Sequence, residues 1–480
     1  MTATSDILES PEAVLTTLRA DGRRRWLYPT PSPGRYMDAR RVVGWVLILL
    51  YIALPIIKIG GYPAVLLDVM QREFAFFGIV FYPTDTLLLM AFLIGIIAFV
   101  ILGTALLGRV WCGWGCPQTV YLEFVFRPIE RLLEGKEHTR KRRDEGPATW
   151  DRIWRKAVKW SLYTLVSAVL AHTFVAYFVG WGDLLQWMTG DPREHWGFFL
   201  LMAGTTGLIL FDFGIFREQM CTITCPYARM QSVLLDPESL IVSYDPSRGE
   251  PRARRSKAKM AREADGLEAA KGDCIDCYAC VRTCPTGIDI RDGLQMECIA
   301  CTQCIDACDS IMDKIEKPRG LIRYTSENEL AGGKTRILRP RTILYSLLLL
   351  IAVSAFTTVA VSRDDYDVNI GRVSGDPYTV LPDGAIANRL RFRVRNQTGG
   401  PSSFDVAVIA PEGASIRPIG ALPITLEKGE MKRIEAFVVI DPSSVENGVA
   451  QATFELSFGT GGTERYDFPI LGPSGPGQTR

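Results

Sequence analysis

The twelve cysteines of this 480-residue chain all lie between positions 112 and 308. Eight of them form two runs with the spacing C-x2-C-x2-C-x3-C: Cys274, Cys277, Cys280, Cys284 and Cys298, Cys301, Cys304, Cys308. The other four form two C-x3-C-P motifs: Cys112 with Cys116 and Cys221 with Cys225. Cysteines confined to one stretch indicate metal ligation rather than a disulfide framework, which would be spread over a small secreted domain.

The spacing of the two long runs is that of bacterial ferredoxins with two [4Fe–4S] clusters. In that arrangement the fourth cysteine of each run ligates the other cluster. The sequence therefore predicts one cluster held by Cys274, Cys277, Cys280 and Cys308. It predicts a second cluster held by Cys284, Cys298, Cys301 and Cys304. Structural zinc favours two pairs of cysteines and is the weaker interpretation.

The two C-x3-C-P motifs are less specific. Each follows a pair of apolar runs, a weak internal repeat in which two hairpins would bring four thiols to one membrane face. Soft thiolates select Cu(I), zinc or iron–sulfur clusters. The same cysteines could also form a thiol–disulfide pair or act as small buried side chains. A functional role is favoured, and its chemistry stays open between copper, a third cluster and a disulfide.

Five apolar runs have about the length that a membrane-spanning helix needs. They are 42–60, 84–106, 157–180, 197–216 and 341–361. The stretch 62–82 is also apolar, but prolines and charges interrupt it, and we expect it to be interfacial or re-entrant. A sixth span there would invert the topology.

The distribution of Arg and Lys orients these spans. Segment 109–156 holds eleven of them, whereas the loops 61–83 and 181–195 hold one each. The positive-inside rule therefore places the N-terminus, 109–156 and 217–340 in the cytosol. Five crossings then place 362–480 outside it.

The rest of the composition excludes several classes of function. The net charge of +1 gives no electrostatic case for nucleic acid. Of the three histidines only His172 lies in a predicted span, whereas a bis-histidine haem needs two. No glycine-rich phosphate loop is present, so electrons are expected from another protein rather than from a bound nucleotide or flavin. The basic run 252–262 is expected to lie on anionic lipid.

Beyond the last span, apolar and polar residues alternate as in β-strands. Leu390, Phe392 and Val394 alternate with arginines, and the segment 454–458 shows the same period. Further strands are predicted at 404–411, 424–440 and 465–471, with turn clusters between them. Several short strands in roughly 110 residues predict an immunoglobulin-like β-sandwich, which we expect to serve docking or spacing.

The predicted fold class is a multi-domain membrane protein. It combines an α-helical transmembrane bundle, a cytosolic dicluster ferredoxin insert of the bacterial type and a C-terminal all-β immunoglobulin-like sandwich. The predicted segments are an N-terminal tail 1–41, transmembrane hairpins 42–230, a basic cytosolic linker 231–265, a ferredoxin-like domain 266–325, a last transmembrane helix 341–361 and an outer domain 365–480.

Four stretches between about 110 and 325 carry a family resemblance. They are Trp-Cys112-Gly-Trp-Gly-Cys116-Pro-Gln; Arg217-Glu-Gln-Met-Cys221-Thr-Ile-Thr-Cys225-Pro-Tyr-Ala-Arg-Met-Gln; Tyr244-Asp-Pro-Ser-Arg-Gly-Glu-Pro-Arg; and Gly272-Asp-Cys-Ile-Asp-Cys through Cys308 to Arg319-Gly-Leu-Ile-Arg-Tyr324. In this combination the chain resembles the CcoG/FixG/RdxA family of cytochrome oxidase accessory proteins. The immunoglobulin-like tail fits that family as well.

The resemblance implies a protein of the bacterial inner membrane, with a periplasmic C-terminal domain, that reduces Cu(II) to Cu(I) in the assembly of cbb-type cytochrome oxidase. Copper would be the substrate, and Cys112, Cys116, Cys221 and Cys225 the catalytic and copper-binding thiols. The implied partners are the oxidase assembly machinery, copper-handling proteins, a cytosolic electron donor and membrane lipid. Two alternatives stay open: a quinol-linked electron conduit like the NapH-type subunits, which share the C-x3-C-P hairpins, and a non-redox assembly scaffold.

Overall fold

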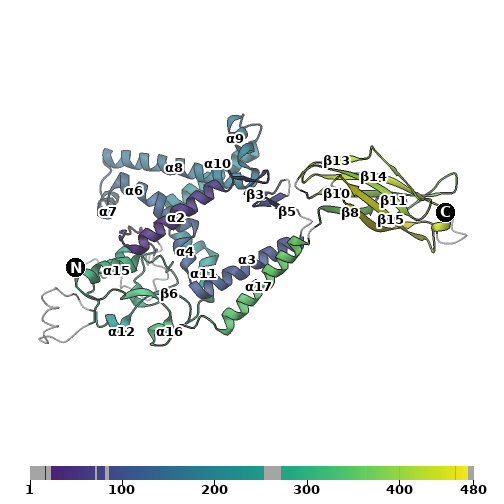
Figure 1. The fold of residues 1–480 in the computed structure, drawn as a ribbon. Coiled ribbons are helices and arrows are strands. Elements are labelled where there is room, and N and C mark those ends of the chain that lie inside the picture. Colours follow the sequence, from purple (N-terminus) through teal and green to yellow (C-terminus); the bar gives the residue numbers. More distant parts are fainter. Residues whose placement is uncertain are drawn as a thin grey trace. The chain divides into compact units, whose positions relative to one another are not determined.

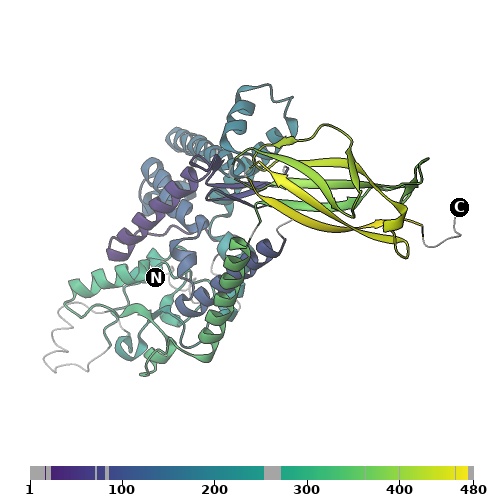
Figure 2. The ribbon, with the colours of Figure 1, turned by 45° about the vertical axis from the view of Figure 1, so that its right-hand side comes forward.

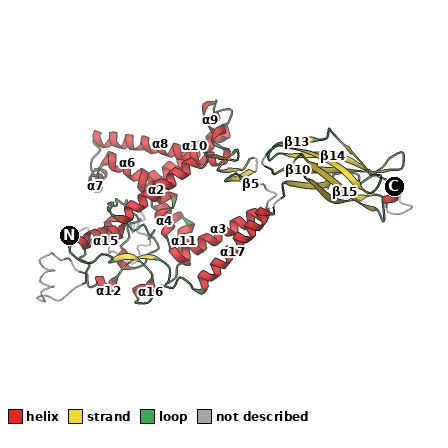
Figure 3. Cartoon of the chain, in the orientation of Figure 1, coloured by secondary structure: helices red, strands yellow, loops and turns green. Residues whose placement is uncertain are grey.

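The computed structural model describes residue 17 and residues 23–473, apart from 71–72, 82–85, 253, 255–271, 363, 399 and 460. The chain divides into two compact units, 1–357 and 358–480. Helices dominate the first unit and strands the second (Figure 3). Most of the basic run 252–262 lies outside the described residues. The finer division of the first unit made from the sequence stays a prediction.

Four helices in the described part of the chain are long and apolar enough to cross a membrane. They are α3 (Thr86–Leu107), α8 (Trp150–Val179), α10 (Trp196–Phe211) with its π-helical continuation η2 (Asp212–Phe216), and α17 (Pro340–Val361). These helices coincide with four of the five predicted spans. Helices α3 and α17 lie side by side (Figures 1 and 2), and the rings of Phe92 and Phe356 are 5.8 Å apart.

The bounds predicted for the first span, 42–60, are wrong. Helix α2 runs from Arg35 to Ala53. It ends there because Pro55 follows, and a proline disfavours helical backbone at the residue before it. The helix also begins earlier than hydropathy suggested, with charged residues such as Asp38 and Arg40 in its first two turns. Arg40 is nevertheless fully buried, because this end of α2 packs against protein.

The apolar stretch 62–82 forms strands rather than a helix. Strands β3 (Val65–Asp68), β4 (Glu73–Phe76) and β5 (Ile79–Phe81) pair antiparallel in that order. The short strands β1 (Lys58–Ile59) and β2 (Tyr62–Pro63) precede them. Exposed sheet edges have no hydrogen-bond partners in lipid, so this sheet is suited to a membrane surface rather than to its interior.

Shorter helical elements carry the cysteines and the segments between them. They are α4 (Val110–Trp114), α5 (Pro117–Tyr121), η1 (Leu122–Phe126), α6 (Arg127–Glu134), α7 (Glu137–Glu145), α9 (Trp181–Thr189), η3 (Met220–Thr224), α11 (Pro226–Leu234), α12 (Pro246–Gly249), α14 (Ala279–Thr283), η4 (Ile290–Asp292), α15 (Gln303–Lys314) and α16 (Glu327–Leu330). Strands β6 (Ile241–Tyr244) and β7 (Ile322–Thr325) form an antiparallel pair. The two strands flank the segment that contains both long cysteine runs, and their pairing brings the two ends of that segment together.

The second unit contains two packed sheets. Its strands are β8 (Tyr366–Arg372), β9 (Thr379–Val380), β10 (Ile386–Asn396), β11 (Ser402–Ala410), β12 (Ser415–Pro418), β13 (Ile424–Leu426), β14 (Met431–Ile440), β15 (Val449–Phe458) and β16 (Thr463–Leu471). One sheet has the order β12-β14-β10-β8, with β9 beside β10, and the other the order β13-β11-β15-β16. Alternate residues such as Leu390, Phe392 and Phe454 are fully buried in the core between them.

One predicted strand of this unit, 424–440, is two strands in different sheets. The chain turns at Gly429, whose φ of 77° lies in the left-handed region that glycine adopts without steric cost. Strand β13 therefore joins the sheet of β11, and β14 joins the sheet of β10.

Candidate functional site

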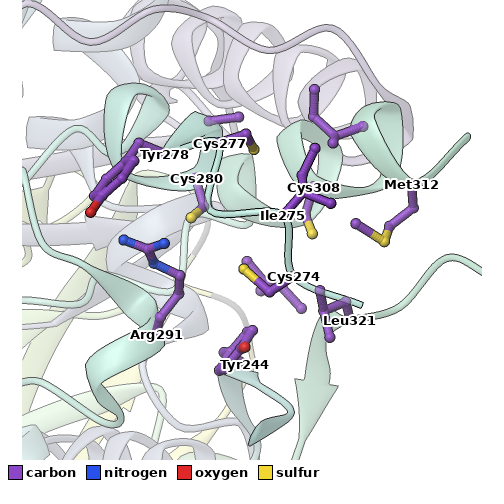
Figure 4. A pocket seen from close by; sticks show the side chains of 13 residues that line it. Tyr244, Cys274, Ile275, Cys277, Tyr278, Cys280, Arg291, Cys308, Met312 and Leu321 are labelled. Atoms are coloured by element: carbon purple, nitrogen blue, oxygen red, sulfur yellow. The ribbon is translucent and has the colours of Figure 1, made fainter. Parts of the chain in front are cut away.

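Cys274, Cys277, Cys280 and Cys308 line one pocket, which we call the first site. Figure 4 shows their sulfur atoms around a common space, with Tyr244 and Arg291 at its edge. Cys280 comes from α14 and Cys308 from α15, so the two cysteine runs both contribute. The structure thus brings together the four cysteines predicted to share a cluster.

Cys284, Cys298, Cys301 and Cys304 line the neighbouring pocket, the second site. Apolar side chains, including Val242, Ile288 and Ile290, form much of its wall. The fourth cysteine of the first run therefore lies with the first three of the second run. This crossed arrangement is the one that the spacing predicts.

The two runs also share an unusual backbone pattern. In the first run Asp276 and Tyr278, on either side of Cys277, have φ values of 54° and 56°. In the second run Ala300 and Thr302, on either side of Cys301, have φ values of 50° and 62°. Left-handed backbone is unfavourable for such residues, and its repetition at matched positions wraps each loop around its pocket in the same way.

The chemistry of the thiols fits iron–sulfur clusters. Burial raises the pKa of Cys298 to about 11 and that of Cys280 and Cys301 to about 12. Such thiols stay protonated at neutral pH unless a cation is close to them, and a bound metal ion deprotonates a coordinating thiol. Two pockets that each hold four buried thiols, with apolar walls, match the ligand set of two clusters.

The C-x3-C-P motifs form a structural repeat at the ends of two long helices. Cys116 and Cys225 have extended backbone and directly precede helices α5 and α11, which begin at the prolines. Proline favours extended backbone at the residue before it and fits the first position of a helix. The repeat extends to the residues four places before each motif, Gly108 and Arg217, with φ values of 58° and 56°.

The two motifs meet in space. The thiol of Cys112 donates a hydrogen bond to Oε1 of Gln231, which lies on α11 after the second motif, at 3.0 Å. Burial raises the pKa of Cys221, and the thiols of Cys116, Cys112 and Cys225 raise it further. All four sulfurs therefore lie within electrostatic reach of one another. We call these four residues the membrane-face cysteines.

The membrane-face cysteines lie directly beside the second site. Cys112 belongs to one buried cluster with Ile299 and Cys301, and Cys221 packs against it. A Cβ atom added to Gly113 would lie 2.6 Å from the carbonyl oxygen of Ile299 and 2.8 Å from Cα of Cys301. Only glycine allows the two loops to approach this closely.

The described residues contain no group of three or more His, Cys, Asp or Glu side chains that could hold a single metal ion.

Comparison with known families gives three matches. The family described as "4Fe-4S dicluster domain" matches residues 216–327, and the family described as "IG-like fold at C-terminal of FixG" matches residues 356–473. The family described as "4Fe-4S binding domain" matches residues 88–137, which include the first C-x3-C-P motif.

Three relatives match most of the chain. Protein RdxA of Cereibacter sphaeroides is 35% identical over 82% of this chain and 83% of its own length. Protein RdxB of the same organism is 32% identical over 90% and 92%. Nitrogen fixation protein FixG of Rhizobium meliloti is 30% identical over 90% and 93%. This chain belongs to the FixG/RdxA family.

Membership of the FixG/RdxA family confirms the resemblance and the fold class predicted from the sequence. The protein is an iron–sulfur electron-transfer protein of the FixG/RdxA type, with ferredoxin and immunoglobulin-like domains. Its apolar helices are those of a membrane protein.

Sequence reasoning missed several residues that hold the site of this FixG/RdxA protein together. Asp306 on α15 accepts hydrogen bonds from the backbone N–H groups of Tyr36 and Met37, and thereby caps α2. Arg40 donates to the carbonyl oxygen of Gly113 at 2.9 Å. Arg40 lies just before the predicted span 42–60, and a charge so close to that apolar run was a signal for such contacts, because buried charges need partners.

A buried ion-pair network joins the two hairpins on the side of the clusters. Glu130 accepts hydrogen bonds from Arg217 at 2.9 and 3.1 Å and from Arg140 at 2.5 Å. Lys159 of α8 binds Glu134 at 2.8 Å. Because Arg217 lies four residues before Cys221, this network fixes the loop that carries the second motif.

Proposed function

We propose that this chain is a membrane-bound reductase that converts Cu(II) to Cu(I), one electron at a time, for the assembly of a cbb-type cytochrome oxidase. The observation that supports it is the close packing of the membrane-face cysteines on the second site, through Gly113 and Cys301. Thiolates bind Cu(I) well, so these residues combine a copper-binding chemistry with a neighbouring electron-transfer centre.

In this proposal the first and second sites each hold one [4Fe–4S] cluster through the four cysteines that line them. Bound clusters supply one-electron transfer, which is the unit that the reduction of one Cu(II) requires. The chain contributes the thiolate ligands, the apolar walls that limit access of water and the short path to the membrane-face cysteines. A cytosolic protein would supply the electron, and the oxidase assembly machinery and copper-handling proteins would be its partners.

We further propose that both clusters face the cytosol and the C-terminal unit faces the periplasm. The N-terminal segment is bound to the cluster region, since Thr30 donates to the carbonyl oxygen of Arg282 at 2.9 Å and Met37 to Asp306 at 2.8 Å. Helix α3 also ends in that region, so it begins on the opposite side of the membrane. Helix α2, about 28 Å long for its 19 residues, must then cross as well. Five crossings result.

The membrane-face cysteines give a direct test. Changing both Cys112 and Cys116 to Ala should leave both ferredoxin-like clusters in place, because these residues line neither pocket. Reduction of Cu(II) by the dithionite-reduced protein should be abolished. The measurements are the iron content and the rate of Cu(I) formation under anaerobic conditions.

The second pair provides the matched comparison. If all four thiols form one site, changing Cys221 and Cys225 to Ala should abolish copper reduction to the same extent. An unchanged rate in both double variants, with iron content preserved, would exclude the membrane-face cysteines as the copper-proximal site.

A quinol-linked electron conduit is the alternative function that a specific observation favours. The match of residues 88–137 to a 4Fe-4S binding family includes Cys112 and Cys116, which suits a third cluster better than a copper site. In that case the reduced protein should be oxidised by a quinone and not by Cu(II). A non-redox scaffold would keep its assembly function in cysteine variants that have lost their clusters but not their fold.

A further inference from the structure

Two buried arginines contact the loops that carry the second site and the membrane-face cysteines. Arg40 is 0% exposed and Arg109 is 5% exposed. Nε of Arg40 donates to the carbonyl oxygen of Gly113, but its two terminal nitrogens have no hydrogen-bond partner. Arg109 donates to the carbonyl oxygen of Met296, and its Nε has no partner.

Among the residues that the structure describes, no Asp or Glu oxygen lies within 4.0 Å of the Arg40 or Arg109 guanidinium. Glu123 is within electrostatic reach of Arg40, but its carboxylate is bonded to Arg127. Buried guanidinium groups usually have a paired anion, so the positive charge here is largely uncompensated.

Both charges lie beside the backbone of the second site. Arg40 is bonded to Gly113, and a Cβ atom on Gly113 would lie 2.8 Å from Cα of Cys301. Arg109 is bonded to the carbonyl oxygen of Met296, two residues before Cys298. Arg109 also lies three residues before Cys112, which packs in one buried cluster with Cys301.

The first site has a different charge balance. Its buried arginine, Arg291, binds Asp276 and Asp289, each at 2.6 Å. Its one positive charge is therefore paired with two carboxylates. Asp309 adds a further carboxylate near Cys308. The two pockets thus have the same kind of ligand, but the buried arginine beside the first site is paired with carboxylates and those beside the second site are not.

Charge next to a cluster changes its reduction potential, because reduction adds one electron and one negative charge. We propose that Arg40 and Arg109 hold the reduction potential of the second site above that of the first, so that an electron from a one-electron donor protein settles beside the membrane-face cysteines. This inference rests on the proposed assignment of one cluster to each site. The difference in reduction potential would direct an electron from the first site to the second. Arg40 and Arg109 would act through their positive charge and would not be ligands of a cluster.

The test is an anaerobic redox titration of the full-length protein in detergent, followed by electron paramagnetic resonance, with no copper added. Two midpoint potentials are expected. Arg40→Gln and Arg109→Gln should each lower the higher one, so that the ratio of reduced to oxidised cluster at a fixed solution potential falls about tenfold, or about 59 mV for one electron. Arg40→Lys and Arg109→Lys, which keep the charge, should recover most of this shift.

Two further variants complete the design. Asp276→Asn should raise the lower potential by removing a carboxylate, and asparagine tolerates the left-handed backbone at this position. Arg282→Gln removes an exposed arginine two residues from Cys280 and should change neither potential by much, because water screens its charge. If Arg40→Gln does not fold, the variants of Arg109 and Asp276 still decide the question.

Unchanged potentials in Arg109→Gln and Asp276→Asn, with full iron content, would overturn the inference. A shift confined to the lower potential in Arg109→Gln would overturn it as well. Because the titration contains no copper, its outcome is independent of whether the protein reduces copper. Failure of the proposed function and failure of this inference can therefore be distinguished.

Discussion

Cys284 and Cys308, the last cysteines of the two runs, each line the pocket of the other run. Cys308 closes the pocket of the first run, and Cys284 closes the pocket of the second. Each run on its own would therefore supply three ligands to one cluster and one ligand to the other. This arrangement makes the stability of each cluster depend on both runs.

Two double variants distinguish crossed from uncrossed ligation. Cys277→Ala with Cys308→Ala removes two ligands from the first site alone, so about half of the iron should remain. Cys277→Ala with Cys284→Ala removes one ligand from each site, so both clusters should be weakened and less iron should remain. Iron and sulfide content after anaerobic purification measures the difference. Equal loss in the two variants, or the reverse order, would contradict the crossed assignment.

The sequence predicts which cysteines share a site, but not the other residues that surround those cysteines. Ligand spacing is local, so the grouping of the eight thiols follows from the order of the runs. The roles of Arg40, Arg109 and Asp306 depend on contacts between segments far apart in the chain, such as that of Arg40 with Gly113. A single sequence contains no periodic signal for such pairs.

The element that carries the second C-x3-C-P motif depends on buried ion pairs. Burial raises the pKa of Glu130, but Arg217, Arg140 and Lys159 lower it more, and the result is a pKa of about 2. Glu130→Gln leaves the guanidinium groups of Arg217 and Arg140 without their carboxylate. We expect a loss of about 3–5 kcal/mol of unfolding free energy, as for other broken buried pairs. Thermal unfolding in detergent measures it.

The loss of unfolding free energy in Glu130→Gln should be largest near neutral pH and should decrease as the pH falls. A carboxylate whose pKa is lowered by folding stabilises the protein above its unfolded pKa, about 4.3 for Glu, and this contribution disappears as the pH falls towards 2. The difference between wild type and Glu130→Gln should therefore be constant near neutral pH and shrink below about pH 4. Glu145→Gln, at an exposed helical pair with Lys141, should change stability by less than about 1 kcal/mol at any pH. If Glu130→Gln and Glu145→Gln lost similar amounts of unfolding free energy, burial of the ion-pair network would not contribute to stability.

Element boundaries were predictable where a local signal ends the element. Three apolar helices were predicted within about two residues of their observed bounds, and the end of α8 was as well, because lipid-length hydrophobic runs are a strong signal; α8 begins earlier than predicted, at Trp150. The prediction for the first helix ignored Pro55 and included residues beyond it. The prediction for 424–440 joined two strands across Gly429, since strands of different sheets can follow one another without a break in apolar character.

At the scale of the whole molecule, the proposed topology has five crossings. Alkaline phosphatase requires disulfides and is active only outside the cytosol. Fused after residue 473 it should be active, and fused in the loop at 146–148, between α7 and α8, it should be inactive. Activity at the loop and none at the C-terminus would invert the topology. Equal activity at both sites would mean that an even number of the three helices between them, α8, α10 and α17, cross the membrane.

The overall architecture was predictable from changes in hydrophobic period along the chain. Long apolar runs, then cysteine spacing, then alternating residues mark the bundle, the cluster region and the sandwich in sequence order. What the sequence could not predict is that Gly113 places the membrane-face cysteines against Cys301. That contact joins segments almost 190 residues apart, and it is the structural basis of the proposed copper chemistry.

The proposed reduction of copper is tested most directly by mixing the reduced protein with Cu(II). The full-length protein is purified without oxygen, reduced, freed of reductant and combined with Cu(II) or with a quinone, while cluster absorbance and Cu(I) formation are followed together. We expect the clusters to be oxidised by Cu(II), with about one Cu(I) formed for each electron lost. Clusters that stay reduced with Cu(II) but are oxidised by the quinone would contradict it and would identify the chain as an electron conduit instead.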